Sequence, residues 1–199
     1  MNYPVPKLVP SGPMYRWCVY EKVFSEEEVD RIKFFKKILN FDQAKIVSDN
    51  PENTNVRNCL SATIPVDDNT SFIYEKIANT VGGANYDFFL YDITSMEMLQ
   101  YLLYESPDGH YCVHRDALHA GYRPEDRKIS FILMLSDPEE YEGGEIYLDR
   151  NLGPEEMKIN TLNKGDMIFF DSNKPHEVTP VTSGQREVIV SWVWGPTQL

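Results

Sequence analysis

Hydrophobic positions recur with two different periods, and the change between them divides the chain into two parts. In residues 25–40 and 70–81, apolar side chains return every three or four positions, as on one face of an amphipathic helix. The first segment opens with a capping box at Ser25, and the second precedes two glycines, Gly82 and Gly83, which are the expected stop. The pattern therefore predicts two helices in the N-terminal part.

From residue 86 onward the pattern favours many short strands. Apolar residues occur there in short runs between Gly, Pro, Asp and Asn clusters, which is typical of an antiparallel sandwich or barrel. The strands expected in this part are 86–93, 96–104, 110–116, 127–135, 144–149, 157–160, 167–170 and 186–194. Earlier strand pieces are expected at 14–24, 46–47 and 56–60, after an extended proline-rich arm at 1–13. Helices packed on one face of a rolled sheet would bury both kinds of element, so the predicted class is α+β, mainly β.

Length and composition are those of a folded domain. The 199 residues fit one domain, with 1–95 as N-terminal support and 96–199 as the core. The chain is 42% hydrophobic and 13% aromatic, which is enough for a packed interior. The net charge of −12 argues against electrostatic binding to nucleic acid, which needs a basic surface. The oligomeric state is not predicted.

Cysteine usage and hydropathy suggest the cytoplasm. Cys18, Cys59 and Cys112 are odd in number and none forms a C-x-x-C pair, which favours a reducing compartment. The N-terminal residues lack the apolar stretch of a secretory signal. No apolar run approaches the roughly 18 residues needed to cross a membrane, so no membrane partner is expected.

Histidine and aspartate residues in the second half predict a metal site. His114 and Asp116 are two positions apart on an expected strand and would project from the same face. His176, after a later apolar strand, is the best candidate for a third ligand. Two histidines and one carboxylate form the facial triad that holds non-haem Fe(II) and leaves coordination positions open. A structural or surface role is the expectation for the remaining histidines, His110 and His119.

Arg186 is the second candidate for chemistry, because it leads into a strand that is apolar on both faces. By strand alternation it shares one face with Trp192. Burying an isolated cation is costly, so the guanidinium needs an anionic partner. The partner is either an internal carboxylate, such as Glu145 or Asp166, or the carboxylate of a bound cosubstrate, which suits the rigid guanidinium fork.

In order and spacing these motifs resemble the Fe(II)- and 2-oxoglutarate-dependent dioxygenases, on their prolyl 4-hydroxylase-like branch. The resemblance covers about residues 98–194 and is loose before them. The matching segments are Tyr104, Gly109–Asp116, Arg127–Ser130, Leu135–Pro138, Tyr141–Glu145, Lys164–Asp166, His176–Val181, Gly184–Arg186 and Trp192.

The resemblance implies a double-stranded β-helix (jelly-roll) core with the N-terminal helices as support. It implies His114, Asp116 and His176 as ligands of Fe(II), and Arg186 as the partner of the distal carboxylate of 2-oxoglutarate. The implied reaction consumes O2, hydroxylates a peptidyl proline and releases succinate and CO2, with ascorbate as an expected supporting reductant. A peptide or protein is therefore the expected partner.

The resemblance also implies residues that line the pocket. Tyr104 falls where relatives place a tyrosine that reaches the cosubstrate or the metal, and Tyr111 and Trp192 fall at lining positions. Met134 stands where some relatives carry a tyrosine beside the cosubstrate carboxylate. Ser130, on the same strand face as Met134, is the candidate to replace that hydroxyl.

Other interpretations stay open. The same chemistry could act on another side chain, a free amino acid or a small metabolite, and a non-catalytic jelly-roll module could keep the metal only for structure. The complete ligand set together with Arg186 favours an enzyme over a binding module. The segments 117–126 and 41–65 are candidates for a substrate lid, or are plain surface loops.

Overall fold

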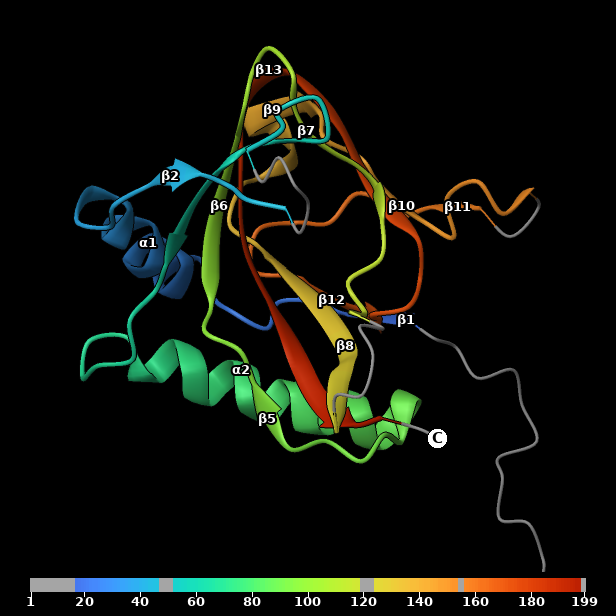
Figure 1. Cartoon of the computed structure of the whole chain (residues 1–199). Coiled ribbons are helices and arrows are strands. Elements are labelled where there is room, and N and C mark those ends of the chain that lie inside the picture. The colour runs from blue at the N-terminus through green and yellow to red at the C-terminus, as the bar shows by residue number, and fades with distance from the viewer. Residues whose placement is uncertain (1–16, 47–51, 119–123, 154–155, 198–199) are drawn as a thin grey trace, which may run out of the picture.

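Two antiparallel sheets that share one long strand form the centre of the computed structural model (Figure 1). The structure describes residues 17–46, 52–118, 124–153 and 156–197. The major sheet has the order β1 (Trp17–Tyr20), β12 (Met167–Asp171), β8 (Glu125–Met134), β13 (His176–Pro196), β6 (Gln100–Glu105), β4 (Leu60–Thr63) and β2 (Asp42–Gln43), with β5 (Ser95–Met96) also on β13. The minor sheet contains β3 (Arg57–Asn58), β7 (Gly109–His114), β9 (Tyr141–Gly143), β10 (Ile146–Leu148), β11 (Met157–Lys158) and the first part of β13.

Strand β13 crosses from one sheet to the other and so sets their arrangement. Its residues 176–184 pair in the minor sheet, and its residues 185–196 pair with β6 and β8 in the major sheet. The crossing is at Gly184, where φ is 73° and an added Cβ would lie 2.0 Å from the carbonyl oxygen of Glu140. Only glycine fits there. The two sheets face each other as in the predicted jelly roll.

The helices cover the outer face of the major sheet, so the sheet separates two apolar cores. The helical elements are α1 (Glu26–Phe34), the 3-10 turn η1 (Phe35–Lys37), α2 (Ser71–Ala84), the π-helical turn η2 (Asn85–Phe89) and the 3-10 turn η3 (Pro138–Glu140). Phe131 and Ile189 pack with the helices, whereas Ile132 and Val188 face the minor sheet. This alternation confirms that β13 is covered on both sides.

Both predicted helices form, but each ends elsewhere than expected. The capping box at Ser25 is present and starts α1, which stops at Phe34 before a 3-10 turn rather than near residue 40. The expected stop of α2 at Gly82 and Gly83 is wrong. The helix continues until Leu90 turns left-handed at φ 55°, where the Asn85 side chain bonds both backbone groups of Tyr91.

Most of the predicted strands are present, but many differ in length from the prediction. The expected strand at 86–93 is wrong, because this segment continues the helix as η2 and then runs irregularly. The strands expected at 144–149 and 157–160 are shorter, and β13 begins ten residues before the predicted 186. The predicted arm at 1–13 and residue 47 lie outside the described residues. In the described part of the chain, none of the helices is long and apolar enough to cross a membrane.

Candidate metal and cosubstrate site

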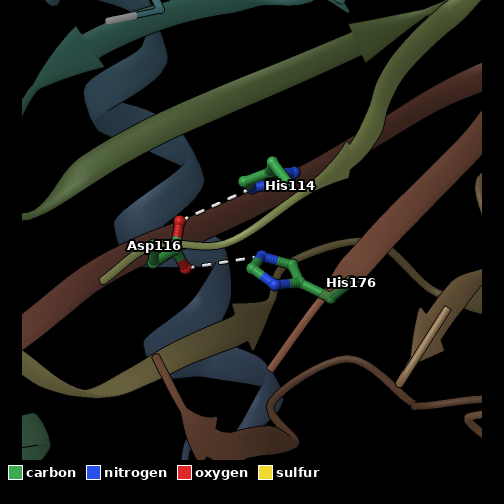
Figure 2. A group of neighbouring side chains, drawn as sticks. All are labelled: His114, Asp116 and His176. Atoms are coloured by element: carbon green, nitrogen blue, oxygen red, sulfur yellow. Dashed lines mark ion pairs between the residues drawn. The ribbon is translucent and has the colours of Figure 1, made fainter. Parts of the chain in front are cut away.

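The three predicted ligands lie together between the sheets (Figure 2). His114 ends β7 and pairs directly with His176, which begins β13. Asp116 lies two residues beyond β7, where its backbone N–H donates to the carbonyl of Ser172 at 2.9 Å. The two oxygens of Asp116 lie 3.5 Å from His114 Nε2 and 3.4 Å from His176 Nε2. The candidate ligand atoms are all within 4.8 Å of one another.

Backbone carbonyls fix both imidazoles in the state that a metal requires. His114 Nδ1 is 2.8 Å from the carbonyl oxygen of Cys112, and His176 Nδ1 is 2.9 Å from that of Lys174. A carbonyl oxygen only accepts hydrogen bonds, so each Nδ1 carries a proton, and Nε2, on the side of Asp116, is the nitrogen that could ligate a metal. Two imidazole nitrogens and one carboxylate are a donor set that fits Fe(II).

The protonation states agree with metal binding. Burial works to raise the pKa of Asp116, but the attraction of His176 and the hydrogen bond and charge of His114 outweigh it, so this pKa is far below its usual range. Burial lowers the pKa of His176 to about 4, against the opposing effect of Asp116. At neutral pH the site therefore holds a carboxylate and a neutral imidazole, and neither must lose a proton before it ligates a metal.

Ser130 lies at the metal ligands. Its Oγ donates to Asp116 Oδ2 at 2.7 Å and lies 2.9 Å from the Oγ of Ser172. It is paired with Trp192 on β13, four residues along β8 from Met134. The structure therefore places Ser130 against the candidate metal ligand Asp116, whereas the side chain that contacts Arg186 is that of Met134.

Arg186 is a buried cation with unused hydrogen-bond donors. Its side chain is 1% exposed, and Nε and Nη1 have no hydrogen-bond partner among the described residues. Nη2 contacts the sulfur of Met134 at 3.6 Å, and the guanidinium carbon lies 5.4 Å from the ring centre of Tyr104. Such a group needs an anion, because an unpaired buried charge is strongly unfavourable.

Neither proposed internal carboxylate pairs with Arg186. Glu145 pairs with Lys158, and Asp166 accepts from the backbone N–H groups of Lys22 and Asn163, each at 2.8 Å. Among the described residues no carboxylate forms an ion pair with Arg186, so the internal ion pair that the sequence left open is not found there. The other predicted partner, the carboxylate of a bound cosubstrate, stays a prediction.

A small cavity adjoins Arg186. Its volume is about 190 Å³, and its wall includes Met134, Tyr141, Gly144, Ile146, Ile159, Leu162 and Arg186. At Gly144, φ is 61° and an added Cβ would lie 2.8 Å from Arg186 Cδ. The absence of a side chain at Gly144 thus makes room for the arginine side chain.

The two aromatic residues predicted to line the pocket flank the metal ligands. The ring of Tyr111 stacks on His114, with centroids 3.5 Å apart and planes at 16°. The guanidinium of Arg127 lies 3.8 Å from the ring centre of Trp192 and is held by both oxygens of Glu97, at 2.6 and 2.9 Å. Tyr111, Arg127 and Trp192 line a groove of about 750 Å³.

Some features of the site carried no usable signal in the sequence. Ser172 and Glu97 act through contacts between distant segments, and Arg57, which also lines the groove, stands in the part that resembles the family only loosely. His110 has the expected structural role, since both ring nitrogens meet backbone carbonyls. His119 and the middle of the candidate lid, residues 119–123, lie outside the described residues.

Known proteins with similar sequences are Fe(II)- and 2-oxoglutarate-dependent oxygenases. Residues 98–194 match the family model of the 2OG-Fe(II) oxygenase superfamily. PKHD-type hydroxylases are similar in sequence: one from Maricaulis maris is 42% identical over 78 residues, 39% of this chain and 33% of that protein. Another, from Crocosphaera subtropica, is 40% identical over 96 residues, 48% of this chain and 41% of that protein. The chain thus spans less than half the length of these relatives.

Solved structures share the fold. A prolyl hydroxylase from Trichoplax adhaerens, in complex with a hypoxia inducible factor peptide fragment, superposes with a TM-score of 0.72 at 18% identity, covering 89% of this chain and 83% of that one. A viral collagen prolyl hydroxylase from Paramecium Bursaria Chlorella virus-1, in a 2OG complex, gives a TM-score of 0.69 at 20% identity, covering 92% and 99%. Residues 98–194 of the chain are thus similar to the 2OG-Fe(II) oxygenase superfamily, and the jelly-roll fold is shared with these prolyl hydroxylases.

Proposed function

We propose that this chain is an Fe(II)- and 2-oxoglutarate-dependent hydroxylase. One observation carries the proposal: the interior that brings His114, Asp116 and His176 together also buries Arg186 with two free donors. A structural metal site would explain the three ligands but not the buried guanidinium of Arg186, which would still lack an anionic partner. A dicarboxylate that reaches both groups explains them together.

The residues of the chain have separate roles in this proposal. His114, Asp116 and His176 would hold Fe(II), and Ser130 keeps the carboxylate of Asp116 in place. Bound Fe(II) supplies the oxidative chemistry that couples decarboxylation of 2-oxoglutarate to hydroxylation, with release of succinate and CO2. Arg186 would hold the distal carboxylate and fix the orientation of the cosubstrate.

The substrate we propose is a prolyl residue of a peptide or protein. The fold shared with prolyl hydroxylases, one of them bound to a peptide fragment, supports this class, as does the open groove beside Tyr111 and Trp192. Hydroxylation of another side chain, a free amino acid or a small metabolite by the same site is the alternative. We also propose that the protein acts in the cytoplasm, because Cys18, Cys59 and Cys112 are all free thiols, as is usual in a reducing compartment. We propose ascorbate as the supporting reductant of the reaction.

Incubation with a peptide library tests the proposal. The protein, Fe(II), 2-oxoglutarate and ascorbate are incubated in air with proline-containing peptides and with a matched set in which alanine replaces proline. Mass spectrometry should find products heavier by one oxygen atom in the proline set, with an equal amount of succinate. Products only from the alanine set would refute the prolyl substrate but retain the hydroxylase, whereas iron binding without succinate would support a binding module.

A further inference from the structure

We infer that the substrate carries a carboxylate and that Arg57 binds it. The inference rests on the proposed hydroxylase function and adds the chemical class of the substrate. Arg57 lies on β3 of the minor sheet, at the register position opposite Tyr111 of β7. It faces the groove of about 750 Å³ that Tyr111 and Trp192 also line.

Arg57 is buried without a counter-ion. Its side chain is 7% exposed, its Nη1 donates to the carbonyl oxygen of Lys45 at 3.1 Å, and its Nε has no hydrogen-bond partner among the described residues. The guanidinium carbon lies 4.7 Å from the ring centre of Tyr111. No carboxylate of the described chain forms an ion pair with it. A full charge is thus held out of water with an unused donor.

The groups that surround Arg57 do not supply the missing negative charge. Burial raises the pKa of Cys59, although Arg57 itself works against this shift. Burial likewise raises the pKa of Tyr104 above the usual value for a phenol. Both side chains are therefore neutral at neutral pH, and no residue that the structure describes supplies the compensating anion.

The other cations of the groove are already compensated or exposed. Arg127 is held by both oxygens of Glu97, with distances of 2.6 and 2.9 Å. Lys45 is 68% exposed and its Nζ lies 3.6 Å from Glu52. Among the described residues, Arg57 is thus the buried guanidinium of the groove without an anionic partner, and it is suited to bind an anion.

The position of Arg57 relates the anion to the reaction centre. The guanidinium of Arg57 lies over the ring of Tyr111. The same ring stacks on the proposed metal ligand His114, with ring centroids 3.5 Å apart. A single aromatic ring therefore separates the guanidinium from a metal ligand. The carboxylate must be near the carbon to be hydroxylated, as in a C-terminal proline with a free carboxylate or a proline next to an acidic side chain. Arg186, beside Tyr104, serves the cosubstrate instead.

Paired substrates test the inference. One pair is a peptide that ends in proline as the free acid and as the amide, and the other has Asp or Asn next to an internal proline. Each is incubated with the Fe(II)-loaded protein and 2-oxoglutarate, and kcat/KM is measured from the oxygenated product. In at least one pair the acid should react on the order of tenfold better than its neutral partner. The responding pair identifies the source of the carboxylate.

Variants assign the effect to one side chain. Arg57→Gln should remove the preference for the acid, and Arg57→Lys should keep part of it. Arg31→Gln, at an exposed position on α1, is the matched control and should keep the full preference. Loss of the preference in Lys45→Gln to the same extent as in Arg57→Gln would mean diffuse attraction at the rim and would overturn the assignment. So would a larger effect of Arg57→Gln on the KM for 2-oxoglutarate than on that for the acid.

Calorimetric binding of the same pairs, without O2, separates this inference from the proposed function. Tighter binding of the acid without any succinate formation would refute the hydroxylase and keep the role of Arg57. Succinate formation with equal kcat/KM and equal binding for acid and neutral partners would refute the role of Arg57 alone. If the wild-type protein neither hydroxylates nor binds any acid better than its partner, the inference is wrong, whatever the variants do.

Discussion

Ser130 donates a 2.7 Å hydrogen bond to Asp116 Oδ2, the same carboxylate oxygen that lies 3.4 Å from His176 Nε2. The hydroxyl thus orients the carboxylate toward the histidine with which it would share a metal. Groups of this kind, one step removed from the metal, typically change affinity by about 10- to 100-fold when they are lost.

Replacement of Ser130 should therefore weaken iron binding. We expect Ser130→Ala to raise the Kd for Fe(II) about tenfold, because Asp116 loses the bond that holds its orientation. Anaerobic titration measures this Kd, and Ser95→Ala, at an exposed position on β5, is the control. An unchanged Kd in Ser130→Ala would show that the backbone and the histidines alone fix the carboxylate.

Replacement of Arg186 should act on the cosubstrate and spare the metal. Arg186→Ala removes the buried guanidinium that would bind the distal carboxylate of 2-oxoglutarate through its two unpaired donors. We therefore expect the KM for 2-oxoglutarate to rise by about 100-fold. The Kd for Fe(II) should change by less than about threefold, since Arg186 contacts none of the three ligands in the described structure. Arg150→Ala, which removes a surface arginine paired with Glu156 and Glu177, is the control. Equal loss of metal and cosubstrate binding would make Arg186 a structural residue.

Gly144 and Gly153, two of the glycines with left-handed backbones, offer a matched pair. Alanine at either position would have to adopt a positive φ, which should lower the free energy of unfolding by about 1 kcal/mol. Only at Gly144 does the new Cβ also meet Arg186 Cδ, at 2.8 Å, whereas nothing lies within 4 Å at Gly153. Gly144→Ala should therefore raise the KM for 2-oxoglutarate as well as lower the Tm, and Gly153→Ala should lower the Tm only. Equal KM values in the two variants would mean that Arg186 moves freely.

Thiol labelling tests the packing of the interior. Burial raises the pKa of Cys18 to about 12, so at pH 8 only on the order of one molecule in ten thousand carries its thiolate. Cys59 is also buried and has a raised pKa; burial raises the pKa of Cys112 too, but this side chain is partly exposed to the reagent. Alkylation of the native protein at pH 8, followed by peptide mass mapping, should label Cys112 first. Labelling of Cys59 at the rate of Cys112 would contradict the closed interior around β3.

The candidate site was predictable where its chemistry follows from local spacing. His114 and Asp116 are two residues apart on a predicted strand, so their residue types and spacing indicated metal ligands. Arg186 leads into a strand that is apolar on both faces, so it was expected to bind an anion. The contact between Ser130 and Asp116 was not predictable, because it depends on how β8 registers against the chain after β7. No local pattern encodes such a register.

The errors in the fold have similar causes. Gly82 and Gly83 would end an isolated helix, but the buried residues Val81 and Ala84 keep α2 in the core, and the side chain of Asn85 sets the actual end. The first part of β13 was missed because polar residues and Pro180 interrupt its alternation, while pairing with three other strands holds it extended. Arg57 was missed because a single arginine in an irregular segment has no pattern.

Incorporation of ¹⁸O from labelled O2 tests the central claim most directly. The protein is incubated with Fe(II) and 2-oxoglutarate under ¹⁸O2, with His176→Ala as the variant that lacks one ligand, and succinate is examined by mass spectrometry. The account predicts succinate that carries one ¹⁸O atom with the wild-type protein, and none above background with the variant. Wild-type protein that binds Fe(II) and 2-oxoglutarate but forms no labelled succinate would contradict it.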